Sequence, residues 1–226
     1  MKCMILAAGR GERLRPITDR IPKPLVEAGG RPLIVHHLEK LRSCGISDIV
    51  INTAWLGEKL EEYLGNGERF GVNISWSREI PGGLETAGGL RHALHLLGTE
   101  PFLVVNGDTF IDADYSLFAS HRLGAMKAHL WFVEKAAHNP QGDFDLQDGM
   151  VTTDRHYTFS GAAVYDPAAI LEIPDERQPL KPWFEKWIGE RKVSGELLQG
   201  RWFDVGTVQR LREVDEYAAG RNGGQN

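Results

Sequence analysis

Residues 4–25 read MILAAGRGERLRPITDRIPKPL, which places an apolar strand, a glycine-containing turn and a group of cations in direct succession. The small residues at positions 7–9 and 11 allow a ligand to approach the main chain closely. Backbone N–H groups that are free in such a turn form a concavity that suits a phosphate. Because open α/β sheets bind ligands where their strands end, we predict that this loop holds a phosphorylated ligand.

Four cations, Arg10, Arg13, Arg15 and Lys23, bring positive charge to the same loop. The Walker A pattern is not met, because no Gly-Lys-Ser or Gly-Lys-Thr follows at the required spacing. The dinucleotide pattern G-x-G-x-x-G also fails, because Leu14 stands at the third glycine. The loop therefore binds phosphate by another scheme, unless it is only a tight strand-to-helix turn with solvated arginines.

Length and composition fit a globular α/β protein. The chain has 226 residues, of which 42% are hydrophobic and 25% charged. A net charge of −5 argues against general nucleic-acid binding, so the cations of the first loop are expected to bind a small anion. We expect a cytoplasmic protein without membrane contact, because there is no spanning apolar run or signal-peptide pattern, and Cys3 and Cys44 fit no secreted disulfide framework.

Strand and helix patterns alternate along the first half of the chain. This alternation predicts a Rossmann-like three-layer α/β/α sandwich with a mostly parallel, mixed sheet and right-handed crossovers. The expected strands are 4–8, 48–52, 72–77 and 102–105, and the expected helices are 32–45, 56–64 and 90–97.

The pattern changes after Ala125, where strands with few helices between them are expected. We predict that they extend the same sheet and carry a second substrate, and that the whole of 1–226 is a single domain. The expected strands are 129–133, 143–146, 150–153, 158–165, 193–197 and 201–205, with helices at 179–188 and 208–218.

Asp108 and Asp204 are the candidate metal ligands. Each ends an apolar strand and has a glycine close behind it, which leaves room for a bulky ligand beside the acid. Two carboxylates, together with phosphate oxygens and water, are a usual Mg²⁺ site. The alternative is that each acid only caps a turn.

Other side chains that could carry chemistry fit less well. The pairs His36 with His37 and His92 with His95 have no Cys, Asp or Glu that completes a zinc spacing, so packed or solvated histidines are the better interpretation. Ser160 lacks the G-x-S-x-G frame of a nucleophile.

Several motifs in register resemble the sugar-1-phosphate nucleotidylyltransferases along nearly the whole chain. They are LAAGxGxRLxPxT from Leu6, PKPL from Pro22, NGD from Asn106, FSG from Phe159 and WFDVGT from Trp202. Within this family, the segments ETxGG from Glu85, INxAWLG from Ile51 and GDF from Gly142 resemble most the short bacterial uridylyltransferases of N-acetylmuramate 1-phosphate in cell-wall recycling.

The resemblance implies a fold, a reaction and a set of site residues. The fold would be that of the nucleotide-diphospho-sugar transferases, with a nucleotide-binding half at about 1–110 and a sugar-phosphate-binding half at about 111–226. Arg13 and Lys23 would be catalytic, Asp108 and Asp204 would bind Mg²⁺, and the substrates would be UTP and a sugar 1-phosphate. The implied nucleotide-binding residues are Leu6, Ala7, Ala8, Gly9, Gly11, Arg13, Lys23, Gly88 and Asn106, and those for the sugar are Glu85, Asp143 and Gly161.

One departure from the family pattern concerns the sugar. Many hexose-1-phosphate members carry a Glu-Lys-Pro segment shortly before the FSG motif, and this chain does not. The departure counts against a plain glucose or mannose substrate and leaves the residue that holds the sugar phosphate unassigned.

Three alternatives to this function stay open. The chain could use another nucleotide or sugar, as thymidylyl- and guanylyltransferases do, or it could be a cytidylyltransferase of an alcohol phosphate. From a different class, it could be a non-catalytic module that senses nucleotides. The oligomeric state is also open, with a monomer among the options.

Overall fold

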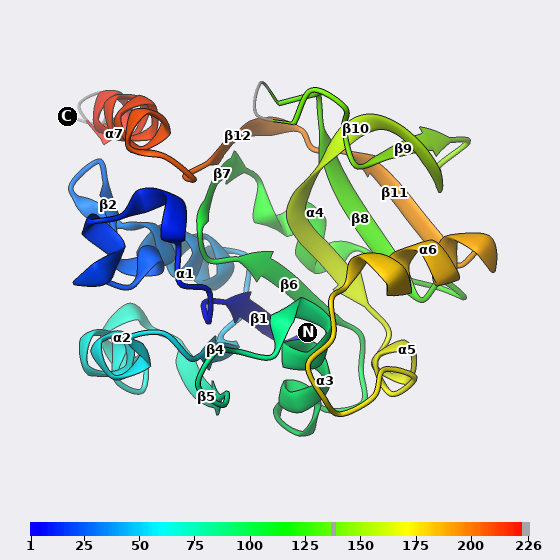
Figure 1. The fold of residues 1–226 in the computed structure, drawn as a ribbon, viewed down its shortest axis with the longest axis horizontal. Helices are drawn as coiled ribbons and strands as arrows, with labels where there is room; N and C mark the ends of the chain where they lie inside the picture. Colours follow the sequence, from blue (N-terminus) through cyan, green and yellow to red (C-terminus); the bar gives the residue numbers. More distant parts are fainter. Residues whose placement is uncertain (137–138, 223–226) are drawn as a thin grey trace.

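The structure, a computed structural model, describes residues 1–136 and 139–222 (Figure 1). Within these residues an eight-stranded mixed sheet has the order β11-β8-β10-β6-β1-β4-β5, with β9 paired to β10. Strands β6, β1, β4 and β5 pair in parallel, as the alternation of strands and helices predicts. This parallel half consists of β1 (Cys3–Leu6), β4 (Asp48–Thr53), β5 (Asn73–Arg78) and β6 (Phe102–Asn106).

Helices cover both faces of the sheet, which gives the predicted three layers. Because side chains alternate along a strand, Cys3 and Ile5 enter one core cluster while Met4 enters another on the opposite face. The first cluster includes side chains of α1 (Leu33–Ser43), α2 (Gly57–Leu64) and α4 (Tyr115–Ser120). The second includes side chains of α3 (Glu85–Leu97), α5 (Pro167–Ile170) and α6 (Lys181–Gly189).

The second half of the chain extends the sheet through one long antiparallel strand. Residues 150–153 and 158–165 form a single strand, β10 (Met150–Tyr165), where the sequence predicts two. Its pairing with β8 shifts register between Phe159 and Ala163, around Gly161, which has φ 83°. The other strands of this half are β8 (Ala128–Val133), β9 (Phe144–Gln147) and β11 (Val193–Leu197).

The prediction that residues 201–205 extend the main sheet is wrong. They form β12 (Gly200–Asp204), which pairs antiparallel with β7 (Thr109–Ala113) in a separate two-stranded ribbon. The reason is a third apolar cluster outside the main sheet, in which Phe110 and Val205 pack with the C-terminal helix α7 (Val208–Asn222). Figure 1 shows α7 beside β2 (Glu27–Ala28), which pairs with β3 (Arg31–Pro32).

No helix in the described ranges combines the length and apolar character that a membrane crossing requires.

Candidate active site

A cavity of about 780 Å³ lies at the carboxyl ends of β1, β4 and β6. This is the edge at which parallel α/β sheets bind ligands. The glycine loop after β1 forms one wall, and the segment before α3 forms the wall across from it. The lining residues are Leu6, Ala7, Ala8, Gly9, Arg10, Gly11, Glu12, Lys23, Pro24, Asn52, Ala54, Trp55, Glu79, Pro81, Gly82, Gly83, Glu85, Thr86, Asn106 and Asp108.

Lys23 reaches into this cavity from a short 3₁₀ turn (Lys23–Leu25). Its Nζ donates a hydrogen bond to Oδ2 of Asp108 at 2.6 Å, although only 6% of the lysine side chain is exposed. Gly11 makes room for it, since a Cβ at that position would lie 3.1 Å from Cδ of Lys23, and Gly11 also has φ 66°. The glycine loop therefore places a nearly buried ammonium group beside the carboxylate.

A side-chain relay joins the two walls of the cavity. Oδ1 of Asn52 accepts a hydrogen bond from the Ala7 amide at 2.7 Å, and its Nδ2 donates to Oε1 of Glu79 at 2.7 Å. Oε2 of Glu79 accepts from the Leu84 amide, also at 2.7 Å. Asn52 and Glu79 are not among the predicted site residues, although a polar residue at the end of the apolar strand β4 is a sequence signal that points to Asn52.

Trp55 lines the first cavity and contacts Arg10, another lining residue. The guanidinium carbon of Arg10 lies 4.3 Å from the ring centroid of Trp55, a cation–π contact. Nε1 of Trp55 donates to the Thr18 carbonyl oxygen at 2.9 Å. The contact with Trp55 thus holds Arg10 at the cavity, in a position from which its positive charge can act on a phosphate.

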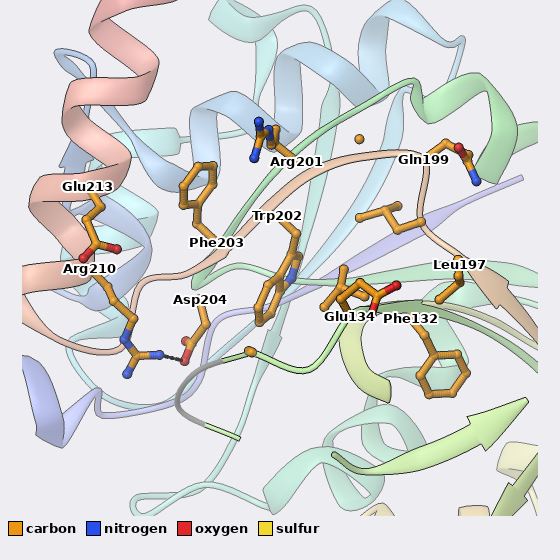
Figure 2. Close-up of a pocket in the computed structure, with 14 residues that line it drawn as sticks. Phe132, Glu134, Leu197, Gln199, Arg201, Trp202, Phe203, Asp204, Arg210 and Glu213 are labelled. Carbon is orange, nitrogen blue, oxygen red and sulfur yellow. Dashed lines mark hydrogen bonds and ion pairs between the residues drawn. The ribbon is translucent and has the colours of Figure 1, made fainter. Parts of the chain in front are cut away.

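A second cavity, of about 530 Å³, lies along β12 (Figure 2). Trp202 and Asp204 lie on one side of the strand and Arg201 and Phe203 on the other, as the two-residue repeat of a strand requires. Nε1 of Trp202 donates to the Ser160 carbonyl oxygen at 2.8 Å, which ties β12 to β10. The lining residues are Phe132, Val133, Glu134, Ala136, Leu197, Leu198, Gln199, Gly200, Arg201, Trp202, Phe203, Asp204, Arg210 and Glu213.

Asp204 sits between two arginines. Nη1 of Arg210 pairs with its Oδ2 (Figure 2), and Nη2 of Arg13 lies 3.9 Å from the same oxygen. The Asp204 side chain is 13% exposed, whereas that of Arg13 is 64% exposed. Most of the Arg13 side chain is therefore accessible, while Arg210, which is not among the predicted site residues, holds the carboxylate in place.

The two predicted metal ligands lie on adjacent backbone segments, which are called the junction below: Asp108 lines the first cavity and Asp204 lines the second. Asp204 pairs with Thr109 in the ribbon, and the Val205 amide donates to the Asp108 carbonyl oxygen at 3.4 Å. Carboxylates from two facing segments are the hard oxygen ligands that Mg²⁺ takes, so this donor set fits the ion. The nearby Lys23 and Arg13 are placed to contact the phosphates that would complete its coordination.

His37 supports this junction from α1. Its ring nitrogens lie 2.8 Å from the Thr109 carbonyl oxygen and 2.7 Å from the Tyr115 hydroxyl. Burial lowers the pKa of His37 to about 4, against an opposing effect of the Thr109 hydrogen bond. The ring is neutral near pH 7 and is packed, as the sequence analysis expects of this histidine.

Gly88 lies apart from the residues that line the two cavities. It is buried in α3, where its amide donates to the Gln178 carbonyl oxygen at 3.2 Å and an added Cβ would meet the Glu176 carbonyl oxygen. Gly82 and Gly83 line the first cavity in its place, with φ of 96° and 74°. The helix therefore needs the small residue at position 88 to pack closely against the segment 176–178.

The three residues predicted for the sugar lie in different places. Glu85 lines the first cavity and pairs with Arg177 at 3.1 Å. The carboxylate of Asp143 accepts hydrogen bonds from Nδ2 of Asn139 and from the Phe159 amide, both at 2.9 Å, so it holds the loop before β9 against β10.

Gly161 contacts a cavity residue without lining the cavity itself. An added Cβ at this position would clash with the side chain of Asn106. Asn106 ends β6 and lines the first cavity. The absence of a side chain at position 161 therefore allows the Asn106 side chain to take its place.

The fold and the paired cavities define a nucleotidyltransferase, and the chain belongs to the nucleotidyl transferase family, whose sequence profile matches residues 2–142. It is 48% identical to the N-acetylmuramate alpha-1-phosphate uridylyltransferase of Neisseria meningitidis over 96% of this chain and 98% of the relative. It is 31% identical to the enzyme of the same name from Caulobacter vibrioides, over 91% and 92% of the two chains. Among solved structures, a putative glucose-1-phosphate thymidylyltransferase from Bacillus anthracis shares the fold, with a TM-score of 0.86 at 23% identity over 97% and 95% of the chains.

Proposed function

We propose that this protein transfers the uridylyl group of UTP to N-acetylmuramate α-1-phosphate, which yields the UDP-sugar and pyrophosphate. The observation that carries the reaction type is the backbone adjacency of Asp108, from the first cavity, and Asp204, from the second, with Lys23 paired to one acid and Arg13 close to the other. The similarity to uridylyltransferases of this sugar phosphate over nearly the full chain supports the choice of substrates.

Each cavity takes one substrate in this proposal. UTP lies in the first cavity, whose lining residues all precede position 110, and the sugar 1-phosphate lies in the second, whose lining residues all follow position 130. This division matches a nucleotide-binding half and a sugar-phosphate-binding half of one domain. The α-phosphate of UTP then faces the sugar phosphate at the junction.

The reaction needs no general base. A phosphate monoester has a second pKa of about 6, so the sugar 1-phosphate carries a nucleophilic oxygen at neutral pH. This oxygen forms a bond to the α-phosphorus of UTP, and the bond from that phosphorus to the bridging oxygen breaks, with its electron pair leaving on pyrophosphate. Lys23 and Arg13 stabilise the negative charge that develops on the α-phosphate and the leaving group.

Asp108 and Asp204 would hold Mg²⁺ at the junction. The ion, when bound, supplies positive charge to the triphosphate. The residues around the two acids keep their carboxylates in position: Lys23 donates to Asp108, and Arg210 pairs with Asp204. We also propose a cytoplasmic role in peptidoglycan recycling, because the product is an activated cell-wall sugar.

Pyrophosphate release with Mg²⁺ tests the function directly. UTP, dTTP, GTP and CTP are each combined with the 1-phosphates of N-acetylmuramate, N-acetylglucosamine, glucose and mannose. We expect the highest kcat/KM for UTP with N-acetylmuramate 1-phosphate. Another preferred pair would keep the reaction and overturn the substrate. UTP binding without pyrophosphate release in any combination would instead identify a nucleotide-sensing module.

A further inference from the structure

Three potential metal ligands from separate elements converge on the face of the sheet that carries Trp131. His121 follows the last residue of α4, His129 lies on β8, and Glu196 lies on β11. One ligand atom from each side chain can be chosen so that all lie within 4.8 Å of one another, and this is the one such group within the described residues. None of the three lines either cavity described above.

His129 has a buried ring nitrogen that points into this group. The residue is 5% exposed, and its Nδ1 lies 2.8 Å from the Ser194 hydroxyl. Its Nε2 has no hydrogen-bond partner in the part of the chain that the structure describes. The separation of 3.7 Å from Nε2 to Oε1 of Glu196 is too long for a hydrogen bond. A buried polar atom without a hydrogen-bond partner lowers the stability of the fold, so we expect this nitrogen to bind a ligand.

The chemistry around His129 is that of a metal-binding imidazole. The ring is buried, and its 3.7 Å approach to Glu196 leaves Nε2 without a hydrogen bond within the described residues. The tautomer that donates its Nδ1 proton to the Ser194 hydroxyl leaves the lone pair of Nε2 facing the group. A histidine that binds a metal through one nitrogen usually donates the other N–H in this way.

The other two residues are accessible, and a hydrogen bond orients one of them, Glu196. The Glu196 side chain is 56% exposed, and its Oε1 accepts a hydrogen bond from Nε1 of Trp131 at 2.7 Å. The rings of His121 and His129 stack with centroids 3.8 Å apart and planes 28° apart. His121 must therefore turn to direct a nitrogen at a shared ion, which its half-buried position at the end of a short helix permits.

We propose that His121, His129 and Glu196 bind one Zn²⁺ ion. Two imidazoles and one carboxylate are a ligand set that suits Zn²⁺, with water in the remaining position, whereas Mg²⁺ and Ca²⁺ take oxygen ligands. The bound ion links the end of α4 to the adjacent strands β8 and β11, and so fixes the edge of the sheet. This proposal does not depend on the reaction proposed above.

Calorimetric titration of the full chain with Zn²⁺ tests this site, with excess Mg²⁺ present to occupy the carboxylates of the active site. We expect one equivalent bound, and a melting temperature that rises by about 5 °C or more when Zn²⁺ exceeds its Kd a hundredfold. Binding of Co²⁺ in place of Zn²⁺ should give the visible absorption bands of a site with nitrogen ligands and low coordination number.

Two variants and one control make the assignment specific. His121→Ala removes a half-exposed ligand, and Glu196→Gln keeps an oxygen for Trp131 while weakening the metal ligand, so neither depends on changing the buried His129. We expect each to lower Zn²⁺ affinity at least tenfold and to remove the rise in melting temperature. The control is His92→Ala with His95→Ala, a surface pair on α3 whose ring centroids lie 6.3 Å apart, and it should bind as the wild type does. Absence of binding to the wild type, or equal binding by His121→Ala and Glu196→Gln, would overturn the proposal.

Discussion

Asp204 lies opposite Thr109 in the two-stranded ribbon, and the amide of the next residue, Val205, donates to the carbonyl oxygen of Asp108, the residue before Thr109. This pairing exists because β12 leaves the main sheet and packs with β7 under α7. β12 therefore places an acid next to the segment that follows β6, at the first cavity. A change that displaces the ribbon should therefore also lower the activity.

Lys23→Ala should lower kcat by a factor of about 10² to 10³, because the nearly buried ammonium group acts on charge that develops in the transition state. Steady-state kinetics with UTP and the sugar 1-phosphate would measure this. Lys59→Ala changes an exposed lysine outside both cavities and should leave kcat unchanged. A rise in the KM for UTP with kcat unchanged would instead make Lys23 a ground-state binding residue.

Asp204→Asn should abolish nearly all turnover and raise the Mg²⁺ concentration needed for what remains, because an amide is a poorer ligand for this ion than a carboxylate. Activity measured as a function of Mg²⁺ concentration checks both effects. Asp175→Asn alters an exposed acid outside both cavities and serves as the control. Wild-type kcat and Mg²⁺ dependence in Asp204→Asn would exclude a metal-binding role for this residue.

Asn52→Ala should weaken both stability and nucleotide binding, since it removes the partner of the Ala7 amide and of Glu79. A buried donor left without its partner costs about 1–3 kcal/mol. Urea unfolding would measure this loss, and titration with UTP should show a higher Kd. Asn73→Ala, at an exposed site on β5, should change neither quantity by a similar amount. An unchanged Kd for UTP would show that the relay only supports the fold.

His37 should make the free energy of unfolding fall as the solution is acidified. Its pKa is about 4 in the folded protein and 6.5 as an ordinary value, so the unfolded chain binds the proton first. The contribution of His37 to the free energy of unfolding is fully present above pH 6.5. It is lost as the pH falls toward 4, and the total loss is about 3 kcal/mol.

His37→Gln tests this linkage, because glutamine does not titrate. Urea unfolding at about pH 7.5 and about pH 5 should show that the variant loses roughly 2 kcal/mol less than the wild type between the two conditions. The comparison of the two proteins cancels what other groups contribute in the same range. An equal loss in both proteins would mean that another group causes the acid sensitivity.

The fold class and the position of the glycine loop at a cavity are predictable from the sequence, because both depend on local patterns. Alternating strand and helix patterns give the parallel half, and small residues after β1 mark the loop. The pairing of β12 with β7 is not predictable in this way, since the apolar pattern of a strand does not determine which sheet the strand joins. Its destination depends on contacts of Phe110 and Val205 with α7, which are distant in the sequence.

Long-range side-chain contacts account for most of what the sequence leaves out of the site. The relay from Asn52 to Glu79 joins two strands and one loop, and no motif records it. The sequence does not distinguish Gly88, which is buried within α3, from Gly83, which precedes α3 and lines the first cavity. Only the packing of α3 in the folded protein shows the difference. The proposed zinc ligands likewise have no recognisable spacing in the sequence, because β8 and β11 meet only in the folded sheet.

β10 has a consequence for how the two substrates are aligned. Gly161 of this strand contacts Asn106 at the first cavity, and the Ser160 carbonyl oxygen holds Trp202 at the second. Residues lining both cavities are therefore held by the same strand, β10. We expect that the two proposed substrates can react without a large rotation of one half of the chain against the other.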